Sequence, residues 1–312
     1  MPNTTDNKHA LSRRELLGGS ALALAGIAAG ACAPSARNTP GEGAAAGGMS
    51  AEATPEATSG GERSGTAPMD LSDDWAATPE RLFDNFVRVR CDREGGIAPW
   101  WWSGVYVAVT PDRNPKVLFA AEGCETKRFV RLGENRYEVW SKVMTVFKDP
   151  ATGEILNGKQ HRNPFTGQMN QVEPNVIGSH VILEPDDEGR ISETPAAGGE
   201  TAALDLTWVR SGDKLLMTGS RDYPEQRPIP LAEYGSTVVD APSLNDPAPN
   251  RLEAVFSAVY LAPWQRFLDM PEQPGHSVWH AVGRKTRSFN ELTEAYLSEA
   301  RRYIPDVLAW AD

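Results

Sequence analysis

The feature that most constrains the fold is a turn sequence that occurs twice in the middle of the chain. Asp149–Glu154 reads DPATGE, and fourteen residues later Asn163–Gln168 reads NPFTGQ. In each copy the Asp or Asn side chain can accept a backbone N–H two residues on, and Pro fixes φ at the next position. Gly then adopts the left-handed conformation that closes a hairpin loop. Strand-like segments surround both copies, so the sequence predicts an antiparallel meander here.

The segment 102–110 shows the strand pattern most clearly. Its two faces are Val105, Val107 and Val109 on one side and Trp102, Tyr106 and Ala108 on the other. Because both faces are apolar, one meets the core and the other meets a helix, a second sheet or an internal cavity. We expect the valines to pack under a C-terminal helix and the aromatic face to line the interior.

Ten or so short antiparallel strands with few helices predict a mainly β fold. Closure removes exposed sheet edges, which favours an antiparallel β-barrel or barrel-like meander, with a two-sheet β-sandwich as the alternative. A short N-terminal helix should begin at Thr78-Pro79, and a capping box at Ser288 to Glu291 should open a C-terminal helix. Segments 186–200 and 223–250 are expected to be loops, the second long enough to act as a lid.

The N-terminus reads as an export signal over residues 1–31. Arg13-Arg14 lies in a twin-arginine motif, and the apolar run that follows is too short to span a membrane permanently. Ala29-Gly30-Ala31-Cys32 resembles a lipobox, which predicts that Cys32 becomes the acylated first residue of an envelope lipoprotein. The alternative is ordinary signal-peptidase cleavage at a small-x-small site, which Pro34 disfavours.

Residues 32–70 contain almost no large apolar side chains, so they cannot bury enough surface to offset their ordering entropy. We interpret them as a disordered low-complexity tether, followed by a single β-rich globular domain over residues 71–312. The tether would hold this domain in the periplasm or cell envelope. The protein would contact the membrane only through the lipid anchor. A net charge of −11 and a pI near 5.1 argue against nucleic acid as a partner.

Several of these segments together resemble a known family. They are Trp102 to Tyr106 (WSGVY), the two turns, Asn175, Ala262-Pro263-Trp264 and His280 to Lys285 (HAVGRK). They are similar to a bacterial, often twin-arginine-exported family known as domain of unknown function 1838. The similarity covers about residues 80–308. It implies one domain and an exported location, and it implies no reaction.

The sequence carries no strong catalytic signature, since it has no G-x-S-x-G, H-E-x-x-H or C-x-x-C motif. Candidates for acid/base chemistry are His161, His180 and His280. His276 and His280 lie four apart on a predicted strand, a span of roughly 13 Å, so two ligands of one metal are not expected there. We therefore expect no metal and no organic cofactor. For each histidine, a hydrogen-bonded structural role is the alternative.

Aromatic residues are the candidates for an apolar pocket. Trp100-Trp101-Trp102, Trp264 and Trp279 can either line such a pocket or pack in the core. We expect Trp102, Tyr106, Asn163, Trp264 and Arg266 to contact a ligand, with at least one of the three candidate histidines at the wall.

Cys91 and Cys124 are the other two cysteines besides Cys32. An oxidising compartment permits a disulfide between them, and two buried free thiols are the alternative.

Two function classes follow. The first is a non-catalytic envelope protein that binds a small, largely apolar molecule in a barrel cavity. The second is a cofactor-independent envelope enzyme that uses a histidine for acid/base chemistry in the same cavity.

The lipobox generates the first testable prediction. The mature protein should begin at a lipid-modified Cys32 and sediment with membranes, whereas the Cys32→Ser variant should lose the lipid and become extractable by salt alone. Intact mass and membrane fractionation measure this. An unmodified N-terminus that begins after Cys32 would contradict it.

Overall fold

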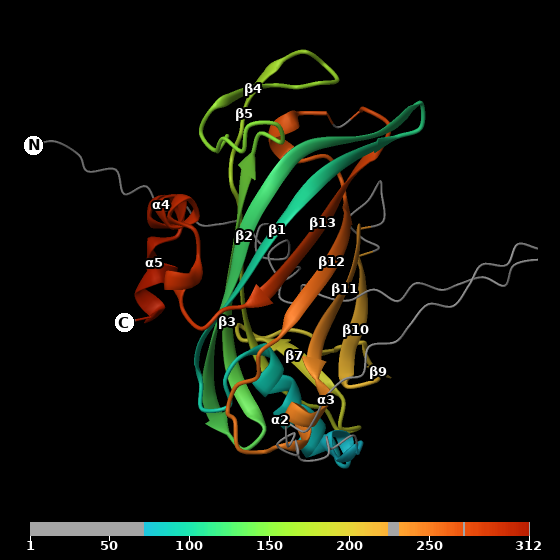
Figure 1. Cartoon of the computed structure of the whole chain (residues 1–312), viewed down its shortest axis with the longest axis vertical. Helices are drawn as coiled ribbons and strands as arrows, with labels where there is room; N and C mark the ends of the chain where they lie inside the picture. Colours follow the sequence, from blue (N-terminus) through green and yellow to red (C-terminus); the bar gives the residue numbers. More distant parts are fainter. Residues whose placement is uncertain (1–71, 224–230, 271, 312) are drawn as a thin grey trace, which may run out of the picture.

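The computed structural model describes residues 72–223, 231–270 and 272–311. An eleven-stranded antiparallel sheet dominates it, with strand order β8-β7-β6-β3-β2-β1-β13-β12-β11-β10-β9 (Figure 1). These strands are β1 (Gly96–Thr110), β2 (Arg113–Gly133), β3 (Arg136–Lys148), β6 (Asn175–Pro185), β7 (Ile191–Pro195), β8 (Ala202–Ala203), β9 (Leu206–Ser211), β10 (Lys214–Tyr223), β11 (Leu231–Asp240), β12 (Val255–Ala262) and β13 (His276–Lys285). A separate hairpin pairs β4 (Gln160–Arg162) with β5 (Met169–Gln171).

The sheet curls until its two edges approach each other. β8 and β9 stand at opposite ends of the strand order, yet only Leu204 and Asp205 separate them in sequence. That connection spans at most about 11 Å. Among the described residues no ladder joins the two edges, so the sheet is barrel-like without being a closed barrel. The prediction of a mainly β, antiparallel, barrel-like fold is confirmed.

Both ends of the curled sheet are covered (Figure 1). Helix α2 (Pro79–Arg90) lies at the lower end, and the β4–β5 hairpin lies at the upper end. The helix begins as predicted, because the Thr78 side chain accepts the N–H of Arg81 at 3.2 Å and Pro79 is the first helical residue. Its buried apolar residues join the main core.

Both copies of the repeated turn form as predicted. The Asp149 carboxylate accepts two backbone N–H groups at 2.8 Å each, and the Asn163 side chain accepts two at 2.9 and 3.2 Å. Gly153 and Gly167 have φ values of 73° and 75°, which favour glycine. The second turn closes the β4–β5 hairpin, so this stretch forms a small sheet of its own and adds no strand to the large one.

The C-terminal segment packs on the outer face of β2 and β3. Helices α4 (Glu294–Tyr303) and α5 (Pro305–Leu308) contribute to a second apolar cluster: Cys124, Met144, Val146, Leu292, Tyr296, Ala300, Ile304 and Val307. Helix α4 begins after Thr293, which caps it, and the predicted capping box at Ser288 precedes only the short 3-10 turn η4 (Phe289–Glu291). The valines of β1 are half-buried on the outer face and do not belong to this cluster, which corrects their predicted position.

Two predicted loops contain regular structure. Segment 186–200 includes β7, and segment 223–250 includes β11 and the short helix α3 (Ala241–Asn245). β11 is paired on both sides, with β10 and β12. Residues 224–230 of the predicted lid segment 223–250 lie outside the described residues, as do the export signal and the tether. Within the described ranges, no helix is both long enough and apolar enough to cross a bilayer.

Cys91 and Cys124 are free and buried, so the disulfide that the sequence permits between them is not formed. Cys91 belongs to the main core at the end of α2, whereas Cys124 belongs to the outer cluster under the C-terminal helices. Burial raises the pKa of the Cys91 thiol to about 11 and that of Cys124 to about 12.

These values predict inert thiols. In the Cys32→Ser variant at pH 8, alkylation of Cys91 should be about 100-fold slower than that of an ordinary thiol, and alkylation of Cys124 about 1,000-fold slower, because the thiolate is the nucleophile. After denaturation without a reductant, both should react at once, as mass spectrometry can follow. Absence of two titratable thiols in the denatured protein would contradict the free-cysteine arrangement.

Candidate functional site

A small cavity lies on the inner side of the curled sheet. Its volume is about 20 Å³, and it is lined by Trp102, Tyr106, Glu125, Val143, Thr145, Asn175, Tyr260 and Trp279. Six of these residues are buried, whereas Asn175 and Tyr260 are half-buried. The cavity therefore opens toward solvent beside Asn175 and Tyr260.

Strand alternation places the lining residues on one face. Trp102 and Tyr106 are inward-facing residues of β1, as the alternation in the sequence predicts. Trp279 of β13 stands opposite Tyr106 in the ladder. β3 contributes Val143 and Thr145 from its buried face.

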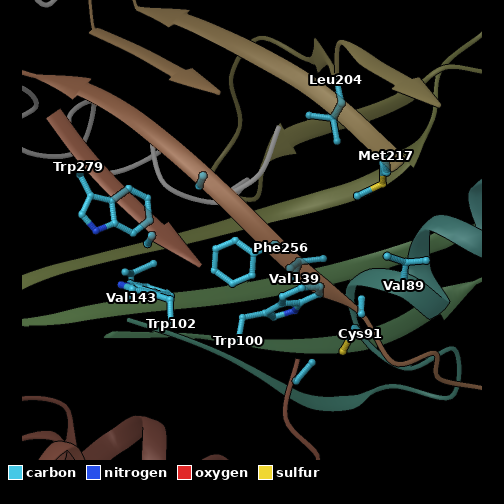
Figure 2. Close-up of a cluster of buried hydrophobic side chains, with 14 of the residues drawn as sticks. Val89, Cys91, Trp100, Trp102, Val139, Val143, Leu204, Met217, Phe256 and Trp279 are labelled. Carbon is cyan, nitrogen blue, oxygen red and sulfur yellow. The ribbon is translucent and has the colours of Figure 1, made fainter. Parts of the chain in front are cut away.

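The Trp102 ring is held in place by its neighbours. A Cβ atom at Gly123 of β2 would lie 2.3 Å from the indole, so only glycine allows the ring to lie this close to the strand. Phe256 and Trp279 meet the ring nearly edge-on, with centroid distances of 6.3 and 5.7 Å (Figure 2). These contacts fix the orientation of the indole.

Two hydrogen-bond donors in the wall lack partners. The indole N–H groups of Trp102 and Trp279 are buried and have no hydrogen-bond partner among the described residues. A buried donor without a partner costs about 1–3 kcal/mol. An acceptor atom within hydrogen-bond reach of either N–H group would offset that cost for the donor.

The remaining polar groups of the wall are Tyr106, Thr145, Asn175, Tyr260 and Glu125. Burial raises the pKa of the Tyr106 phenol well above its ordinary range, opposed by a hydrogen bond with Thr145. The phenol therefore stays neutral and can act as a donor or an acceptor at physiological pH.

Glu125 belongs to a buried charged network between the sheet and α2. Its Oε1 accepts the Ser141 hydroxyl at 2.9 Å and lies 3.4 Å from Lys127 Nζ, while its Oε2 lies 3.5 Å from the Arg90 guanidinium. The Arg90 guanidinium also lies over the Trp100 ring, 4.7 Å from its centroid. Burial, and after it the positive charge of Arg90, lowers the pKa of Lys127 to about 8, although Glu125 opposes the shift.

None of the three candidate histidines lines the cavity. His180 lies on the outer face of β6, where its Nε2 is 2.7 Å from Glu138 Oε1 and its ring stacks on Trp140 at a centroid distance of 3.6 Å. His280 is exposed on β13, and His161 of β4 packs against Phe119 at 5.4 Å. The expectation of a histidine at the cavity wall is therefore wrong.

Three other predicted ligand contacts lie at the upper end of the sheet instead. Asn163 is buried and donates through Nδ2 to the Leu268 carbonyl at 2.9 Å, which ties the hairpin to the short 3-10 turn η3 (Arg266–Leu268). Trp264 donates to the Gln273 carbonyl at 2.8 Å, and Arg266 is exposed.

Four residues of the cavity wall were not predicted from the sequence: Glu125, Val143, Thr145 and Tyr260. The one sequence signal that could have indicated them is Glu125, an acidic residue within a strand-like segment of apolar and β-branched residues.

The described ranges contain no group of three or more His, Cys, Asp or Glu residues arranged to hold a metal ion.

Comparison with known families identifies the family to which most of the chain is similar. A family model described as "Protein of unknown function (DUF1838)" matches residues 97–307, which is more than half of the chain. No curated protein matches the chain. No solved structure matches it either.

The buried network generates a prediction about pH. The folded protein releases the Lys127 proton near pH 8, whereas the unfolded chain keeps it up to the ordinary value of 10.5. Between these values the unfolded state binds more protons, so this lysine makes stability rise with pH. Between about pH 8 and pH 10.5, the free energy of unfolding of the wild type should rise by up to about 3 kcal/mol relative to that of Lys127→Met.

Urea unfolding at several pH values measures the difference in free energy of unfolding between the two proteins. Titration of the cysteines and tyrosines does not affect this difference, because both proteins contain the same cysteines and tyrosines. Lys116→Met, on the exposed start of β2, is the matched control and should show no such trend. A difference between wild type and Lys127→Met that stays constant with pH would refute the depressed pKa.

Proposed function

The chain belongs to the DUF1838 family, whose function is unknown, and we propose that it is an exported, lipid-anchored envelope protein that binds a small, largely apolar molecule. The observation that carries this proposal is the cavity on the inner face of the sheet. Two tryptophans, two tyrosines and a valine form most of its wall, with a few polar groups among them. That combination is typical of small-molecule sites.

The cavity size restricts how a ligand binds. A volume of about 20 Å³ accommodates one water-sized group. A larger molecule would therefore place only one end in the cavity and its body at the opening, beside Asn175 and Tyr260.

The envelope location is supported by the sequence. Arg13-Arg14 and the Ala-Gly-Ala-Cys32 segment suit export of a folded domain followed by lipid attachment. The chain would contact the membrane only through that lipid, and it would need neither a metal nor an organic cofactor to bind its ligand. The acidic net charge of −11 suits neither nucleic acid nor an anionic lipid surface.

Glu125 favours a second candidate function, a cofactor-independent enzyme that does acid/base chemistry in the same cavity. With the three histidines elsewhere, a carboxylate in the wall is the group that would move a proton. Its contacts with Ser141, Arg90 and Lys127 would fix its position.

Binding is tested by filling the cavity. Native mass spectrometry of the protein purified from its own envelope should reveal one retained apolar molecule per chain. Val143→Ile adds one methyl group to the wall and should weaken retention about tenfold, because an overpacked site costs roughly 1–3 kcal/mol.

Val139→Ile makes the same change on the same buried face of β3 outside the cavity, and it should retain the molecule. Equal retention by both variants would exclude the cavity as the binding site. Incubation of the retained molecule with the protein in D₂O separates the two functions: a carrier leaves it unlabelled, whereas an acid/base enzyme introduces deuterium that Glu125→Gln prevents.

A further inference from the structure

We propose that the ligand presents a neutral oxygen acceptor, such as the carbonyl group of a ketone or ester, to the indole N–H groups of Trp102 and Trp279. This inference rests on the proposed binding function and names the chemical class of the ligand. It starts from the two unpartnered donors in the cavity wall.

Other tryptophans of this protein show that the two donors are exceptional. Trp100 donates to the Arg90 carbonyl at 3.0 Å, and Trp101 donates to Glu122 at 2.8 Å. Trp75 donates to Asp73 at 3.2 Å. Trp102 and Trp279 are as deeply buried, with exposed fractions of 2% and 4%. Their N–H groups lack partners in the described ranges, and both residues border the same cavity.

The two indoles are placed to act together. They come from the neighbouring strands β1 and β13 and meet edge-to-face at a centroid distance of 5.7 Å and an interplanar angle of 76°. In Figure 2 both indole nitrogens lie on the side of the rings next to Val143, another residue of the wall. A carbonyl oxygen has two lone pairs and can accept from both donors at once.

The charges of the wall favour a neutral group over a carboxylate. Glu125 is the one charged residue among those that line the cavity, and it is an acid. Arg90 and Lys127 contact Glu125 but are not part of the wall. A ligand carboxylate would thus be desolvated close to another carboxylate without a cation of its own, which is costly. A carbonyl avoids this cost and still satisfies both N–H groups.

Three probes of similar size test the inference: cyclohexanone, methylcyclohexane and cyclohexanecarboxylate. Titration of the wild-type protein is followed by the ¹H–¹⁵N signals of the indole N–H groups. Cyclohexanone should move the Trp102 and Trp279 signals downfield to saturation, because each N–H gains a hydrogen bond. Methylcyclohexane can occupy the opening but should leave both proton shifts near their starting values.

Substitution measures the contribution of each donor. In Trp102→Phe or Trp279→Phe, the ratio of ketone affinity to hydrocarbon affinity should fall about fivefold, the value of one neutral hydrogen bond. Trp100→Phe removes an indole of the same aromatic cluster whose N–H is already paired, and it should leave the ratio unchanged. If a variant does not fold, the titration of the wild-type protein still tests the inference. Its Trp102 and Trp279 N–H signals can be assigned through their contacts with the Val143 methyl groups.

The outcomes separate this inference from the proposed function. If ketone and hydrocarbon bind equally and no indole proton shifts, the acceptor proposal is overturned while binding in the cavity stands. If the carboxylate binds most tightly, the neutral class is wrong. If no probe binds in the millimolar range, both the inference and the proposed binding function fail.

Discussion

The constraint on which the rest of the structure depends is the short connection between the two edges of the sheet. β8 and β9 are the first and the last of the eleven strands in the ladder order, with nine strands between them, whereas only two residues separate them in sequence. The sheet must therefore curl into a barrel-like shape and create an interior that side chains have to fill. Helix α2 and the inward-facing aromatic residues fill most of that space, and the small cavity remains among them.

Such curvature draws neighbouring strands and side chains close together, and three glycines make the approach possible. A Cβ atom at Gly104 would lie 2.3 Å from the His280 carbonyl oxygen, and one at Gly283 would lie 2.2 Å from the Trp101 carbonyl oxygen. At Gly123 the Cβ would meet the Trp102 indole. The residues that let the sheet bend thus also set the position of the cavity wall, which couples fold and site through β1, β2 and β13.

The sequence predicted the features that depend on local chemistry. The repeated turn, the capped start of α2 and the inward face of Trp102 and Tyr106 follow from side-chain hydrogen bonds, proline geometry and the two-residue strand period. β7 and β11 were missed because their polar or proline-flanked sequences are weak strand formers, and it is pairing with the adjacent strands β6, β10 and β12 that holds them in the sheet. The histidines were misplaced because titratable character shows nothing about which face of a strand a residue occupies. Glu125 is accommodated inside through Arg90, and that partner lies 35 residues away.

β2 carries two buried acids that connect the two sides of the sheet. Glu122 and Glu125 lie three residues apart and therefore on opposite faces. Glu122 accepts hydrogen bonds on the outer face from Trp101 at 2.8 Å and from Thr293, the N-cap of α4, at 2.7 Å.

Glu125 holds Arg90 of α2 on the inner face and borders the cavity. Removal of either acid would leave buried donors or cations without a partner, which costs far more than a surface ion pair contributes. The two carboxylates thus fix β2 from both of its faces at the point where it borders the cavity. A ligand in the cavity would bind to a wall that is already rigid.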